Sequence, residues 1–193
     1  IPKVNESKYV IINSIIFPNL SFFNLDLMTH KLLILIFMAA LFSSSAAQEL
    51  PTVEEVNLTK YTGTWYEIAR LPNSFEKGMQ CVMATYTLKD NGKIEVLNKG
   101  YIAKKGKYKS ARGNAWVPDR EYPGRLKVTF FWPFSGNYYI MALDEDYQYA
   151  LVGDPSRKYL WVLARSSALE ESIYSELMSL AKSKGFDVER VIR

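Results

Sequence analysis

Regular turn signals are the feature that most restricts how this chain can fold. From Thr64 onward, pairs and triplets of glycine, proline, asparagine and aspartate separate short segments in which apolar and polar residues alternate. Short alternating segments joined by tight turns are typical of consecutive antiparallel strands. Eight strands are expected, at Trp65–Arg70, Val82–Lys89, Ile94–Tyr101, Ser110–Val117, Arg125–Trp132, Asn137–Leu143, Tyr147–Gly153 and Lys158–Arg165.

The alternation also predicts which residues of three strands face the interior. The strand from Asn137 is apolar on both faces, which indicates that another element covers its outer side. The expected inward residues are Val82, Ala84, Tyr86 and Leu88, then Ile94, Val96 and Asn98, then Leu126, Val128, Phe130 and Trp132.

One helix is expected after the strands. The run 167–170 reads as a capping box, Ile173, Leu177, Leu180 and Ala181 form an apolar stripe, and Gly185 supplies the stop. Closure into a barrel removes both unpaired sheet edges. The predicted fold is therefore all-β: an eight-stranded antiparallel up-and-down β-barrel with one C-terminal α-helix packed on its wall.

The first part of the chain is not expected to join this fold. Residues 1–27 are an upstream extension with no assigned function, and residues 28–47 read as a signal peptide with cleavage after Ala47. A membrane anchor is the alternative, although the apolar run Leu32–Phe42 is shorter than the roughly 20 residues that a span needs. Residues 48–193 then form one domain of a periplasmic or secreted protein.

Histidine and cysteine are almost missing from the sequence. The one histidine, His30, lies in the predicted signal peptide, so the mature chain has no imidazole for a catalytic triad or a histidine-ligated metal. The one cysteine, Cys81, has no partner for an internal disulfide. No catalytic residue, metal or cofactor is therefore expected.

A basic run, residues 104–109, surrounds Gly106 between two predicted strands. A solvated hairpin is the simplest interpretation, and a patch for lipid or nucleic acid is the alternative. We expect no nucleic-acid partner, while a peripheral membrane contact is compatible with the run.

Three motifs resemble the signature regions of the lipocalins. They are Gly63-Thr64-Trp65-Tyr66 on the first strand, the acidic-aromatic turn 144–149, and Arg165 at the end of the last strand. The runs WYEIARLPNSFEKG, ATYTL, GKIEVLNKGY, ALVGDP and YLWVLARS make the chain most similar to the bacterial outer-membrane lipocalins, with apolipoprotein D and plant temperature-induced lipocalins as relatives. The bacterial members carry a lipid-bearing cysteine at the cleavage site, where this chain has Gln48, so no lipid anchor is expected even if the protein associates with an outer membrane.

The resemblance implies a barrel that is closed at one end and binds a hydrophobic ligand through the other. Arg165 would lie across the Trp65 ring at the closed base beside Gly63, and the loop 71–78 would fold partly over the open end. Glu67 lies on the same face of its strand as Trp65, so its side chain is expected inside the barrel with a tyrosine or arginine partner. The Asn98 amide also faces inward and needs a hydrogen-bond partner, either a ligand head group or a water. The implied ligand contacts are Trp161, Tyr138, Phe130, Val128, Asn98, Tyr86, Ala69 and Ile140.

The predicted function is binding, storage or transport of fatty acids or lysophospholipids in membrane maintenance, without turnover. Two alternatives stay open. One is a thiol-dependent lipocalin enzyme using Cys81, which begins the second strand without a histidine to activate it. The other is a binder of a rigid pigment or haem. Both a monomer and a homodimer are compatible with the sequence.

Overall fold

The computed structural model describes residues 49–193. The predicted signal peptide and upstream extension lie outside the described residues.

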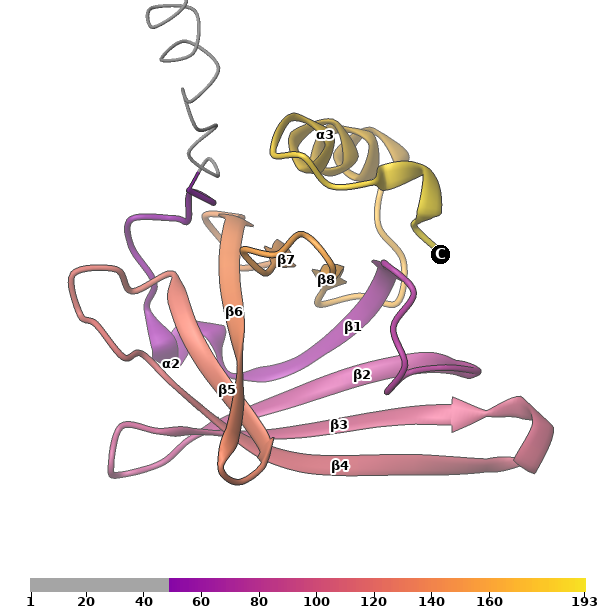
Figure 1. Cartoon of the computed structure of the whole chain (residues 1–193), viewed down its shortest axis with the longest axis horizontal. Helices are drawn as coiled ribbons and strands as arrows, with labels where there is room; N and C mark the ends of the chain where they lie inside the picture. The colour runs from indigo at the N-terminus through magenta and orange to yellow at the C-terminus, as the bar shows by residue number, and fades with distance from the viewer. Residues whose placement is uncertain (1–48) are drawn as a thin grey trace, which may run out of the picture. The chain divides into compact units, whose positions relative to one another are not determined.

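Eight antiparallel strands form a closed barrel in sequence order, with β1 paired to β8 (Figure 1). This confirms the predicted fold class. Gly92 and Gly106 adopt positive φ at the first two hairpin turns after β2 and β3, as turn glycines often do. The strands are β1 (Gly63–Arg70), β2 (Met79–Leu88), β3 (Ile94–Ile102), β4 (Lys107–Trp116), β5 (Arg125–Phe131), β6 (Phe134–Leu143), β7 (Tyr149–Gly153) and β8 (Leu160–Ala164).

Two helices and two short 3-10 turns complete the described region. They are α2 (Leu58–Tyr61), η1 (Ala103–Lys105), α3 (Glu171–Ser183) and η2 (Val188–Arg190). Since successive strands run in opposite directions, the loop after β1 and the turns β3–β4, β5–β6 and β7–β8 share one end of the barrel. The helix α2 precedes β1 at the other end (Figure 1).

The predicted helix is present as α3, which buries Leu177 and Ala181 against the outer side of the barrel. Its partners there include Leu151 of β7 and Val162 of β8. The predicted capping box is wrong, because Glu170 is the N-cap residue and its side chain makes no capping hydrogen bond. At the other end Gly185 has φ +85, and the next backbone N–H, of Phe186, donates to the Ala181 carbonyl at 3.1 Å.

The inward faces follow the predicted alternation except near strand ends. Trp132 was expected inside but is 84% exposed, because β5 ends at Phe131 and Trp132 lies in the β5–β6 turn. A register shift between Val128 and Phe131 precedes that turn, so the period of two no longer applies there. Leu88, the last residue of β2, is also exposed for the same end-of-strand reason.

Candidate ligand-binding cavity

Arg165 closes the base of the barrel over Trp65. Its guanidinium carbon lies 3.9 Å from the Trp65 ring centroid, and its N–H groups donate to the carbonyls of Lys60, Thr62, Thr64 and Tyr147 at 2.8–3.1 Å. Trp65 is fully buried and donates its indole N–H to the Tyr61 carbonyl at 2.9 Å. One side chain therefore joins β8 to the chain entering β1 and to the β6–β7 turn.

Gly63 makes this closure possible for two reasons. Its φ of +97 is strained for any L side chain, and an added Cβ would lie 3.2 Å from Nη1 of Arg165. The three predicted base residues, Gly63, Trp65 and Arg165, thus lie together in the structure.

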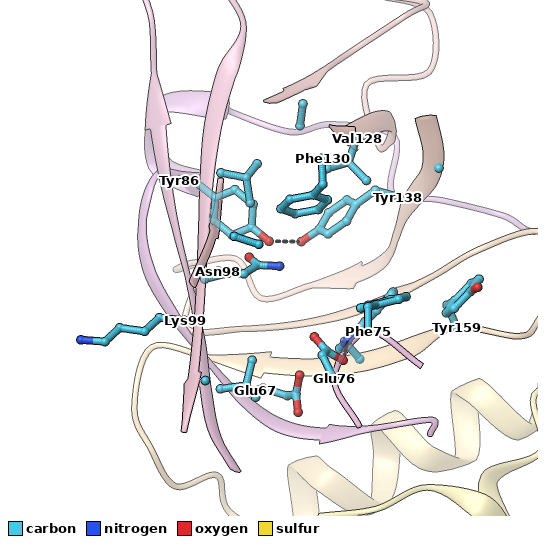
Figure 2. A pocket seen from close by; sticks show the side chains of 18 of the residues that line it. Glu67, Phe75, Glu76, Tyr86, Asn98, Lys99, Val128, Phe130, Tyr138 and Tyr159 are labelled. Atoms are coloured by element: carbon cyan, nitrogen blue, oxygen red, sulfur yellow. Dashed lines mark hydrogen bonds between the residues drawn. The ribbon is translucent and has the colours of Figure 1, made fainter. Parts of the chain in front are cut away.

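Above this base the barrel encloses a cavity of about 540 Å³, within the range of known small-molecule sites. Most of its wall is apolar, from residues such as Ile94, Val96 and Leu126. Six of the eight predicted contact residues line it, several of them visible in Figure 2. These six are Trp161, Tyr138, Phe130, Val128, Asn98 and Tyr86.

The other two predicted contacts do not line the cavity. Ala69 is buried in the cluster beneath α3, because a register shift between Glu67 and Ala69 reverses the alternation along β1. Ile140 is fully buried among interior residues that include Trp65, so it belongs to the packed core rather than to the cavity wall. Parity along a strand could not reveal the register shift at Ala69, whereas Ile140 does lie inside the barrel, as the resemblance implied, but in the packed core.

Three tyrosines form a buried hydroxyl chain beside the cavity. The Tyr138 hydroxyl lies 2.7 Å from that of Tyr61. It also lies 3.0 Å from that of Tyr86, the hydrogen bond drawn in Figure 2. Burial raises the pKa of Tyr86 to about 12 and raises the pKa of Tyr61 and of Tyr138 well above the ordinary value. All three are therefore neutral at physiological pH, and their hydroxyls are neutral hydrogen-bonding groups.

Two buried carboxylates line the cavity near its open end. Glu67 of β1 contacts Nη1 of Arg70, and Glu76 of the β1–β2 loop lies 3.7 Å from Nε of the same arginine. Burial, followed by the neighbouring Glu76 charge, raises the pKa of Glu67 to about 7, against the lowering effect of Arg70. Glu67 thus points inward with an arginine partner, as predicted, but Glu76 was not foreseen.

Glu76 is held in place by its own loop and by β8. Its carboxylate accepts from Nδ2 of Asn73 at 2.5 Å and from the Trp161 indole N–H at 3.2 Å, both on Oε2. Asn73 also accepts from the backbone N–H of Glu76 at 2.9 Å. The sequence signal was the N-x-x-E spacing inside the loop 71–78, which a pattern search for strands passes over.

Aromatic rings lie beside Glu76, whose carboxylate accepts from the Trp161 indole. The Tyr159 and Trp161 rings stack with centroids 6.0 Å apart and an interplanar angle of 6°. Phe75, half exposed on the β1–β2 loop, lies 5.6 Å from Tyr159 and 6.3 Å from Trp161 between centroids. The loop therefore brings one apolar ring and one carboxylate to the open end, as Figure 2 shows for Phe75, Tyr159 and Glu76.

Cys81 does not take part in this site. It is exposed, has φ +49, and lies where the β2–β3 register shifts between Gln80 and Met83. Cys81 is not among the residues that line the cavity. Within residues 49–193, no group of three or more His, Cys, Asp or Glu side chains is arranged to hold a metal ion.

Comparison with known proteins identifies the family of this chain. Residues 56–193 match the model of the lipocalin-like domain. The chain belongs to the lipocalin family. It is 42% identical over 146 residues to the outer membrane lipoprotein Blc of Vibrio cholerae, covering 75% of this chain and 85% of the relative. It is 37% identical over 153 residues to temperature-induced lipocalin-1 of Arabidopsis thaliana, covering 75% and 81%.

The fold of this lipocalin is also that of solved structures. Insecticyanin from the tobacco hornworm Manduca sexta superposes with a TM-score of 0.60 at 24% identity, over 75% of this chain and 82% of that chain. In the part of the chain that the structure describes, no helix has the length and hydropathy to cross a membrane.

Proposed function

We propose that this lipocalin binds and carries single-chain amphiphiles, namely fatty acids or lysophospholipids, without chemical turnover. The observation that supports this most is the shape of the cavity: Trp65 and Arg165 seal the base, the wall is apolar, and the charged groups Glu67, Arg70 and Glu76 gather toward the open end. Such an arrangement suits an alkyl chain inside and a polar head group at the mouth.

Binding without turnover is favoured over the thiol-dependent alternative by the position of Cys81. The Cys81 thiol is exposed and is not among the residues that line the cavity, and no histidine exists in residues 49–193 to activate it. No feature of the described residues favours a pigment or haem over a flexible chain. A visible absorption band on the purified protein would reverse that preference.

We further propose that the protein works at a membrane surface after export, whether as a monomer or a homodimer. The predicted signal peptide and the similarity to outer membrane lipoproteins support this location. The β5–β6 turn supports the contact itself: Phe131, Trp132 and Phe134 are 71–84% exposed at the open end. Exposed lysines of the β3–β4 hairpin, Lys104, Lys105, Lys107 and Lys109, turn at the same end and suit anionic lipid.

Native mass spectrometry of the purified protein, followed by lipid extraction, tests the proposal directly. We expect one bound amphiphile per chain, identified as a fatty acid or a lysophospholipid. A protein that retains no lipid and that also fails to bind added fatty acid or lysophospholipid would contradict it.

A further inference from the structure

The charges at the open end of the cavity are not balanced. Glu67 and Glu76 line the cavity with side chains only 5% and 8% exposed, and the same arginine, Arg70, contacts both. When both carboxylates are ionised, they and one guanidinium leave a net negative charge in a buried place. Burial and the neighbouring Glu76 charge accordingly raise the pKa of Glu67 to about 7, so near neutral pH either a proton or a cation from a ligand balances that charge. An unmatched buried charge is costly, so a cationic group from a ligand would be stabilising there.

The lysines near the cavity do not supply that positive charge. Lys99 and Lys109 are among the residues that line the cavity. The Lys99 side chain nevertheless points away from Glu67 and Glu76 (Figure 2), and its Nζ lies 4.4 Å from the centroid of the Tyr108 ring. Lys109 is exposed on β4. Within residues 49–193, the ion pairs of Glu67 and Glu76 are therefore those with Arg70.

Each carboxylate also keeps one oxygen available for a ligand. Asn73, Trp161 and Arg70 all contact Oε2 of Glu76, and Arg70 contacts Oε1 of Glu67. In the described part of the chain no hydrogen bond reaches Oε1 of Glu76 or Oε2 of Glu67. When both carboxylates are ionised, as Glu67 mostly is above its pKa of about 7, these two oxygens accept hydrogen bonds or a positive charge and do not donate.

The aromatic rings beside Glu76 have the composition of a site for organic cations. Phe75, Tyr159 and Trp161 lie within 5.6–6.3 Å of one another between ring centroids. Ring faces beside a carboxylate attract ammonium and quaternary ammonium groups, because the negative face of each ring adds to the charge of the carboxylate. An anionic head group gains nothing from either.

Deeper in the cavity, Asn98 also favours a lysophospholipid over a fatty acid. Its Oδ1 is buried without a hydrogen-bond partner, and the side chain projects into the cavity below the Tyr86–Tyr138 pair (Figure 2). A buried acceptor without a partner requires a donor. The carboxylate of a fatty acid has none, whereas the glycerol hydroxyl of a lysophospholipid does.

We propose that Glu67, Glu76, Phe75, Tyr159 and Trp161 form a subsite for a cationic head group, so that this lipocalin prefers amphiphiles bearing an amine or quaternary ammonium over fatty acids of equal chain length. This rests on the proposed function and narrows it to lysophospholipids with choline or ethanolamine head groups.

Three probes with the same alkyl chain separate the two proposals. They are tridecyltrimethylammonium, which is cationic, monomyristoylglycerol, which is neutral, and myristate, which is anionic, each titrated into delipidated protein below its micelle concentration. The measurements are made at about pH 8, where Glu67, with a pKa of about 7, is mostly ionised. We expect the cation to bind at least about tenfold more tightly than myristate, since each factor of ten needs only ~1.4 kcal/mol.

Variants then assign the preference to the subsite. Glu67→Gln and Glu76→Gln each remove one charge at nearly constant volume, and each should weaken binding of the cation about tenfold while leaving the neutral probe within about twofold. Tyr159→Leu, which alters no charge, should weaken binding of the cation by about fivefold and leave binding of the other two probes unchanged. Glu95→Gln is the matched control. Glu95 is on β3, pairs with Lys89 and Arg112, and does not line the cavity.

The outcomes are distinct. Equal affinity for the three probes, or a cation preference that survives all three subsite variants, would overturn the subsite while the proposed function stands. Failure of all three probes to bind would sink the proposed function as well.

Discussion

At the scale of single residues, the most consequential side chain is Arg165. It stacks on the buried Trp65 ring at 3.9 Å and donates to four backbone carbonyls at the barrel base. Burial lowers its pKa, yet the group remains charged at every physiological pH.

Replacing Arg165 by Leu should therefore reduce the free energy of unfolding by ~1–3 kcal/mol, from the lost cation–π contact and the lost hydrogen bonds to the four carbonyls. The chain should still bind ligand, because Arg165 does not line the cavity. Urea denaturation measures the loss, and Arg112→Leu on the outer face of β4 is the control. An unchanged midpoint in Arg165→Leu would show that the stack does not stabilise the fold.

Gly63 gives an independent test of the same base. Gly63→Ala places a Cβ 3.2 Å from Nη1 of Arg165 at a φ of +97, whereas Gly106→Ala, at φ +58 in an open turn, meets nothing within 4 Å. Both substitutions cost backbone strain of ~1 kcal/mol or more, and Gly63→Ala should cost ~1 kcal/mol beyond Gly106→Ala. Equal melting temperatures for the two variants would contradict the close approach of Arg165 to Gly63.

At the scale of elements, the exposed aromatic turn between β5 and β6 has a function to test. Replacing Phe131 and Trp132 together by Ser removes two rings that are 76% and 84% exposed, so the fold should lose little stability. Binding to anionic phosphatidylglycerol vesicles should weaken at least about tenfold, because burial of each ring is worth ~1.5–3 kcal/mol. Co-sedimentation measures this, with Tyr122→Ser, outside this turn, as control. Undiminished binding would remove the turn from the membrane contact.

The elements themselves were largely predictable from the sequence, because strand alternation and turn glycines are local signals. All eight strands lie within a few residues of the predicted ranges. What local pattern could not give was the register shift that turns Ala69 outward, or the end of β5 that exposes Trp132. Both depend on pairing with another strand.

The residues that line the cavity were likewise predictable only in part. Tyr86, Val128 and Asn98 followed from parity, and Trp161 from the resemblance to the lipocalins together with parity. Glu76 and Phe75 reach the cavity only because the β1–β2 loop folds back over the open end. That path is fixed by Asn73 and by long-range contacts to β8.

At the scale of the whole molecule, the buried Glu67 couples stability to pH. Its pKa is raised to about 7 by burial, so between about pH 4.5 and pH 7 the folded chain holds a proton that the unfolded chain has released. Stability from this group is present below that window and is lost as pH rises through it, by up to ~3 kcal/mol. Glu67→Gln should flatten the decline in urea titrations between about pH 5 and pH 8. A wild-type stability that rises across this window would contradict the raised pKa.

If the barrel holds an alkyl chain, its affinity for a ligand must depend on the length of that chain. Lysophosphatidylcholines of increasing acyl length are titrated into delipidated protein, followed by Trp161 fluorescence or by calorimetry. Burial of each added pair of methylenes contributes ~1.6 kcal/mol to the binding free energy. Affinity should therefore rise about tenfold per pair until the cavity of about 540 Å³ is filled. Trp161→Ala should weaken every member of the series. An affinity that does not change with chain length would contradict binding of the alkyl chain inside the barrel.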